Sequence, residues 1–108
     1  MPSTLVVEAQ KLARIHLPNS ELSVANLAKM LGYSSEHLSR RFRAECGCTL
    51  TEWITDQRIA LARELLADPR CNIAETGWAC GFSAPSYFIR VFHRKTGVTP
   101  RAYRHLKD

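Results

Sequence analysis

Apolar residues recur at three- and four-residue steps along most of the chain, as the buried faces of helices require. The longest such stretch covers residues 49–68 and contains no Gly or Pro before Pro69. Thr49 and Glu52 have the spacing of a capping box, and Pro69 disfavours helix at the residue before it. The pattern predicts a helix about 28 Å long. Its expected buried residues are Leu50, Trp53, Ile54, Ala62, Leu65 and Leu66.

Two similar segments, residues 24–49 and 73–99, lie on either side of this predicted helix. They match at an offset of 49 residues, which becomes 50 after Ser34 because one residue is inserted in the second segment. Each reads as two short helices joined by a tight turn, at Gly32 in the first segment and Gly81 in the second. This arrangement is typical of a helix-turn-helix unit. The sequence therefore predicts one supersecondary unit present twice.

The rest of the chain adds a helix near residues 4–17 and a short one from Thr99-Pro100 through Tyr103. No stretch alternates strongly enough to predict a strand. We therefore expect an all-α fold of about seven helices, with two helix-turn-helix subdomains joined by a long linker helix. The expected boundaries within this single domain are 1–48 for the N-terminal subdomain, 49–68 for the linker helix and 69–108 for the C-terminal subdomain.

The net charge of +5 is unevenly distributed. Residues 1–69 hold eight Lys/Arg and eight Asp/Glu, whereas residues 70–108 hold seven and two. A basic surface attracts polyanions, which include nucleic acids, anionic membranes and acidic proteins. No apolar run approaches the roughly 20 residues of a membrane span, and the chain does not start like a signal peptide. We therefore expect a cytoplasmic protein with no membrane partner.

The four cysteines do not have the spacing of a metal site. Cys46 and Cys48 form only a C-x-C pair, with no second close pair and no His at zinc-finger spacing. Cys46 and Cys80 fall on apolar faces of helical patterns and are interpreted as small core residues. The sequence also contains no Ser/His/Asp or Cys/His constellation. We expect no metal, no cofactor and no catalytic residue, and thus a chain that is not an enzyme.

The second helix of each repeated segment carries the residues that decide the function. Both exposed faces centre on an arginine at the matching position, Arg40 in the first segment and Arg90 in the second. Arginine can bond a guanine edge through two parallel donors, or pair with phosphate. The other residues on these faces are Glu36, Ser39, Arg43, Ser86, Ile89 and His93.

A simpler interpretation of these faces is that they are only solvated. Any amphipathic helix has a polar outer side, and Glu36 has the spacing to pair with Arg40 on the same helix. Two copies with matching arginines, Gly turns and a basic excess favour DNA binding instead.

The motifs GYSSEHLSRRF and GFSAPSYFIRVF resemble the paired helix-turn-helix units of the AraC/XylS family of bacterial transcription regulators. The resemblance spans about residues 5–105 and is strongest over residues 58–103. It implies a sequence-specific regulator of transcription, expected to be an activator that contacts RNA polymerase and is associated with the nucleoid. It also implies a monomer on an asymmetric site of double-stranded DNA, with two recognition helices in successive major grooves. Many members carry a sensor domain, for which this chain has no room.

The resemblance also implies residue roles. The base-contacting positions correspond here to Glu36, Ser39, Arg40, Pro85, Ser86, Ile89 and Arg90. The phosphate-contacting residues that we expect are Arg43, His93, Arg94 and Lys95. Pro85 and Ile89 depart from the polar residues often found at their positions. The second helix is therefore expected to recognise thymine methyl groups or DNA shape, or mainly to hold phosphate.

Two other classes of function stay open. One is a protein-interaction module that has kept the fold but lost DNA recognition, and the arginines at both matching positions argue against it. The other is a DNA-targeting domain of a larger enzyme, because related domains are fused to repair activities. Binding to duplex DNA separates the first alternative from a transcription regulator.

Overall fold

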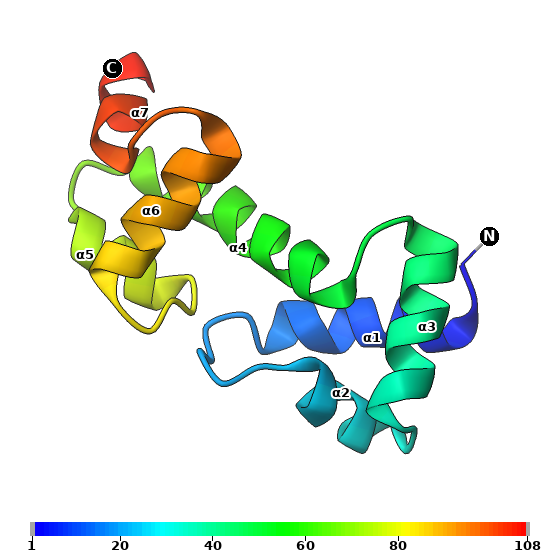
Figure 1. Cartoon of the computed structure of the whole chain (residues 1–108). Helices are drawn as coiled ribbons and strands as arrows, with labels where there is room; N and C mark the ends of the chain where they lie inside the picture. The colour runs from blue at the N-terminus through cyan, green and yellow to red at the C-terminus, as the bar shows by residue number, and fades with distance from the viewer. Residues whose placement is uncertain (1, 108) are drawn as a thin grey trace. The chain divides into compact units, whose positions relative to one another are not determined.

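The computed structural model describes residues 2–107, and Figure 1 shows the course of the chain. This range contains seven helices and no strand, which confirms the expected all-α fold. The helices are α1 (Thr4–Ile15), α2 (Val24–Leu31), α3 (Ser35–Cys46), α4 (Leu50–Leu66), α5 (Ile73–Ala79), α6 (Pro85–Thr96) and α7 (Pro100–Lys107).

Six of the seven helices begin at a polar side chain that accepts a hydrogen bond from a backbone N–H of the first turn. Such caps satisfy groups that have no partner inside the helix. The exception is α6, whose N-cap Ala84 makes no side-chain bond and whose first residue is Pro85. The inserted residue explains this, because it moves Ser83 away from the cap position that Ser34 occupies in α3. The capping residues are Ser3, Ser23, Ser34, Thr49, Asn72 and Thr99.

Three helices end at other residues than predicted. α1 ends at Ile15 rather than near residue 17. α4 ends at Leu66, because the N–H groups of Ala67 and Asp68 donate to carbonyls three residues back rather than four. α7 continues past Tyr103 to Lys107, so the predicted end there was wrong. The stretch after Tyr103 holds no Gly or Pro that would stop a helix. In addition, the Arg104 guanidinium donates to the backbone carbonyl of Leu66 at 3.1 Å.

The chain divides into two compact units between Thr55 and Asp56, inside α4, and the short segment Pro18–Ser20 groups with the second unit. The first unit packs α1, α2, α3 and the start of α4 around one apolar core. Phe42 is fully buried there, and its ring lies edge-on to Trp53 with centroids 5.9 Å apart. Other core residues of this unit are Val6, Leu27, Leu38, Leu50 and Ile54.

The second unit packs the rest of α4 with α5, α6 and α7 around its own core. Phe88 and Phe92 are fully buried and meet edge to face at 5.8 Å. From α4 this core takes Ala62 and Leu66, as predicted, and also Ile59, which the prediction missed. The prediction treated α4 as having one apolar face, whereas each unit buries its own set of α4 residues.

The two helix-turn-helix turns have the same backbone hydrogen bonds. The N–H of Tyr33 donates to the carbonyl of Ala28 at 2.9 Å, and the N–H of Phe82 donates to that of Gly77 at 3.0 Å. Gly32 ends α2 with φ of 79°, a left-handed conformation that glycine adopts without steric cost. The repeat seen in the sequence is therefore also a repeat of the backbone.

Candidate nucleic-acid interface

One side of α3 faces the core of the first unit and the other side faces solvent. Leu38 and Phe42 are fully buried, whereas Glu36, Ser39 and Arg40 are exposed. Nη2 of Arg40 lies 2.7 Å from Oε1 of Glu36, so the guanidinium is held by a carboxylate one turn earlier. Both side chains are open to water, where such a pair is weak. A guanine edge can therefore compete with Glu36 for Arg40.

The exposed side of α6 carries Ser86, Ile89 and Arg90. Within residues 2–107, Arg90 has no carboxylate partner; its Cζ lies 5.6 Å from the centroid of the Tyr87 ring. A guanidinium over an aromatic face is attracted by the ring and keeps its full charge. The arginines at the matching positions are thus held by different groups, a carboxylate in α3 and a ring in α6.

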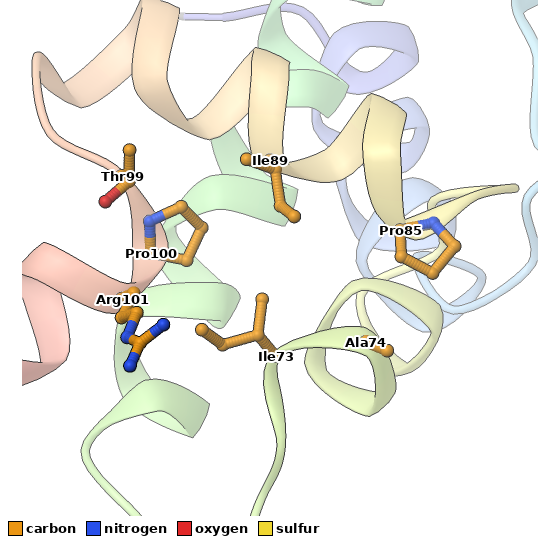
Figure 2. Close-up of a pocket in the computed structure, with 7 residues that line it drawn as sticks. All are labelled: Ile73, Ala74, Pro85, Ile89, Thr99, Pro100 and Arg101. Carbon is orange, nitrogen blue, oxygen red and sulfur yellow. The ribbon is translucent and has the colours of Figure 1, made fainter.

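An open apolar pocket of about 330 Å³ lies beside this side of α6 and is shown in Figure 2. Pro85 and Ile89 line it from α6, Ile73 and Ala74 from α5, and residues 99–101 from the start of α7. In Figure 2 the side chains of Ile89 and Ile73 both point into the pocket. The two α6 residues that depart from polar character thus belong to one apolar surface, which suits a methyl group better than a polar base edge.

The predicted phosphate-binding residues differ in whether a carboxylate already pairs with them. Arg43, His93 and Arg94 are exposed and have no carboxylate partner in the described part of the chain. Nζ of Lys95 instead lies 2.9 Å from Oδ1 of Asp56 on α4. Lys95 can reach a phosphate only in competition with this ion pair.

All the predicted site residues lie on two helices, one in each unit. On α3 they are Glu36, Ser39, Arg40 and Arg43, and on α6 they are Pro85, Ser86, Ile89, Arg90, His93, Arg94 and Lys95.

Two further residues beside the α6 set were not singled out from the sequence. Tyr87 precedes Arg90 by three residues, a spacing that brings helical side chains together. Among residues 2–107, Arg101 is the only charged residue lining the pocket, and it belongs to the first turn of α7. The excess of Lys and Arg in residues 70–108 indicated that basic residues of this segment bind DNA, but it did not distinguish Arg101 from the others.

The cysteines lie apart from these faces. Burial raises the pKa of the Cys80 thiol to about 12, and burial also raises the pKa of Cys46. Both pack in or against the two cores, as the sequence predicted. Among residues 2–107, no cluster of three or more His, Cys, Asp or Glu side chains has the arrangement of a metal site. In the same range, no helix is long and apolar enough to span a membrane.

Comparison with known proteins identifies relatives over most of the chain. A family model described as "Helix-turn-helix domain" matches residues 27–105. The chain is 37% identical over 99 residues to the arabinose operon regulatory protein of Escherichia coli (strain K12). This match covers 92% of this chain and 34% of that protein. It is 39% identical over 75 residues to the HTH-type transcriptional activator RhaR of Salmonella arizonae, with 69% of this chain and 27% of that protein covered. The chain thus spans about a third or less of these relatives.

One similar solved structure contains DNA. The DNA-binding domain of AdpA, described as a global transcriptional factor in complex with a target DNA, superposes with a TM-score of 0.88 at 31% identity. The match covers 96% of this chain and 93% of that one. Together with two helix-turn-helix units in one chain, these matches identify the chain as a member of the AraC family of helix-turn-helix DNA-binding transcription regulators.

Proposed function

We propose that this chain binds an asymmetric site on double-stranded DNA as a monomer, with α3 and α6 in successive major grooves, and that it activates transcription. The observation that carries the proposal is the repeat itself. Each of two helix-turn-helix units exposes a helix face centred on an arginine, and the two arginines occupy matching positions.

In the first unit, Arg40 donates to a guanine edge when it leaves Glu36. The released carboxylate of Glu36 then accepts from the amino group of a neighbouring cytosine. Ser39, exposed beside them, adds a hydrogen bond to a base or to the backbone. This assignment is supported by the exposure of all three side chains and by the weakness of the Arg40–Glu36 pair in water.

In the second unit, Arg90 donates to a guanine edge and Ser86 contacts the adjacent base. Pro85 and Ile89 provide an apolar surface for a thymine methyl group, which the open pocket between α5, α6 and α7 supports. Because Glu36 corresponds to Ser86 and Ser39 to Ile89, the two units present different chemistry. They should therefore prefer two unlike boxes rather than the halves of a palindrome.

Contacts to phosphate come from Arg43 in the first unit and from His93, Arg94 and Lys95 in the second. Residues 1–48 and 69–108 act as the two DNA-binding subdomains, with residues 49–68 as the linker between them. The activating role is supported by the relative RhaR, whose name describes a transcriptional activator. We further propose that the chain contacts RNA polymerase when bound to DNA, and that it acts in the cytoplasm on the nucleoid.

Selection of bound duplexes from a random pool tests the proposal. We expect enrichment of two unlike boxes about one helical turn apart, each with a G·C pair that Arg40→Ala or Arg90→Ala makes dispensable. Enrichment of a palindrome, or of a single box, would contradict the two-unit proposal. A complete lack of duplex retention would favour the protein-interaction module instead.

A further inference from the structure

We propose that Tyr87 is a positioning residue that holds the guanidinium of Arg90 in its base-contacting orientation. The inference rests on the proposed function, because it concerns how Arg90 performs the role assigned to it there. It adds a determinant of specificity that need not itself touch a base.

The ring of Tyr87 is anchored to the core on one side. It lies edge-on to Phe82, with ring centroids 5.9 Å apart and planes at 64°. Phe82 is only 4% exposed and its ring lies 5.2 Å from that of the fully buried Phe88. Tyr87 itself is 44% exposed, so it connects a rigid aromatic core to the protein surface.

Arg90 lies over this anchored ring, with Cζ 5.6 Å from the ring centroid. An arginine side chain has several rotatable bonds, and contact with a fixed ring reduces the number of conformations that binding must remove. The ring does this without neutralising the guanidinium, as a carboxylate would. The residue that corresponds to Glu36 in this unit is Ser86, which carries no charge to hold Arg90.

The first unit provides an internal comparison. His37, at the position of Tyr87, stacks on Tyr33 with centroids 5.2 Å apart and planes at 17°. The contact between a ring in the turn and a ring on the following helix is thus present in both units, as Tyr33–His37 and Phe82–Tyr87. In the first unit, however, the guanidinium of Arg40 pairs with Glu36. Of the two matching rings His37 and Tyr87, Tyr87 supports an arginine, whereas the matching arginine of the first unit pairs with Glu36. His37→Leu is therefore a matched control for Tyr87→Leu.

The test compares binding of the selected duplex with one in which the G·C pair assigned to Arg90 is replaced. Tyr87→Leu should reduce this discrimination about two- to fivefold, the size of an exposed cation–π contact. Tyr87→Phe removes only the hydroxyl and should keep the discrimination. His37→Leu should leave it unchanged. In an Arg90→Ala background, Tyr87→Leu should have no further effect on base preference.

Urea unfolding of each variant separates positioning from loss of fold, and Tyr87→Gln replaces Tyr87→Leu if the latter does not fold. Unchanged discrimination in the folded ring-deletion variant, with Arg90→Ala still abolishing it, overturns this inference alone. A loss in Tyr87→Phe as large as in Tyr87→Leu also overturns it, because the hydroxyl would then be the active group. If Arg90→Ala itself leaves the preference unchanged, the proposed function of the second unit fails as well.

Discussion

At the scale of single residues, the two units differ most in the surroundings of their arginines. Arg40 lies 2.7 Å from a carboxylate and Arg90 lies over a ring, although their positions in the two repeats match. In the proposed complex with DNA, Arg40 would exchange Glu36 for a base, whereas Arg90 has no carboxylate partner to leave within residues 2–107. The first unit is therefore expected to contribute less than the second unit to the affinity for DNA, and as much as the second unit to the discrimination between base pairs.

Glu36→Gln should separate these two contributions. Removing the carboxylate frees Arg40 and lowers the repulsion from phosphate, so binding to non-specific duplex should tighten about two- to fivefold, the range expected for an exposed ion pair. Preference at the base pair next to the Arg40 guanine should weaken. Competition titrations with duplexes that differ at one pair measure both effects, and Glu64→Gln, exposed on α4, controls for the charge change. Equal behaviour of the two variants would contradict the assignment of Glu36.

A second residue-scale prediction concerns acid stability. A side-chain hydrogen bond from Arg70, followed by the backbone N–H of Arg70, lowers the pKa of Asp68 from 3.8 to about 2. A carboxyl group whose pKa is lower in the folded state stabilises the fold above its unfolded pKa, and this contribution is lost as the pH falls. Between pH 4 and pH 2, the urea midpoint of the native chain should therefore fall more than that of Asp68→Asn. Parallel curves for the two proteins would show that the Asp68–Arg70 contact does not affect stability.

At the scale of helices, the sequence predicted most of the fold because helix periodicity and capping are local. The buried stripes of α3 and α6 follow from a 3.6-residue repeat, and the start of α4 follows from Thr49. The ion pair between Lys95 and Asp56 joins residues far apart in the sequence, so no local pattern contained it. The same holds for the pocket, since its walls come from three helices.

The close approach of α5 to α6 gives a prediction at this scale. Gly77 is buried, and a Cβ added to it would lie 2.9 Å from Cδ2 of Phe88 and 3.0 Å from its Cβ. The first unit has Ala28 and Leu38 at these two positions, so the larger ring is matched by the smaller residue. Gly77→Ala should destabilise the chain by up to about 2 kcal/mol, because overpacking costs about 1–3 kcal/mol and the gain in helix propensity offsets only about 1 kcal/mol.

The compensating change provides the control for this experiment. In a Phe88→Leu background, which resembles the first unit, Gly77→Ala should be neutral or stabilising. Ala28→Gly in the first unit should destabilise by about 1 kcal/mol through helix propensity, and further through the loss of its buried methyl group. Urea unfolding measures all four variants. A Gly77→Ala chain as stable as the native one would show that the two helices can move apart without cost.

At the scale of the whole molecule, the excess positive charge lies in residues 70–108. Contacts to about six phosphates release counterions and should give a slope of log affinity against log salt near −5. Arg94→Ala should reduce this slope by about 1 for all sequences alike. Lys95→Ala should reduce it less, because Asp56 already neutralises the ammonium group. Fluorescence titrations over a range of KCl test this, and a slope near zero would favour a protein-interaction module.

The most direct measurement asks whether one chain uses both units on one site. Five base pairs inserted between the two selected boxes place them on opposite faces of the duplex, since one turn takes about 10.5 base pairs. The affinity for this duplex should fall to that for a single box, with one chain bound, while five base pairs added outside the boxes should change nothing. Undiminished affinity for the inserted duplex, or two chains bound to the native site, would contradict a monomer that recognises DNA through both α3 and α6.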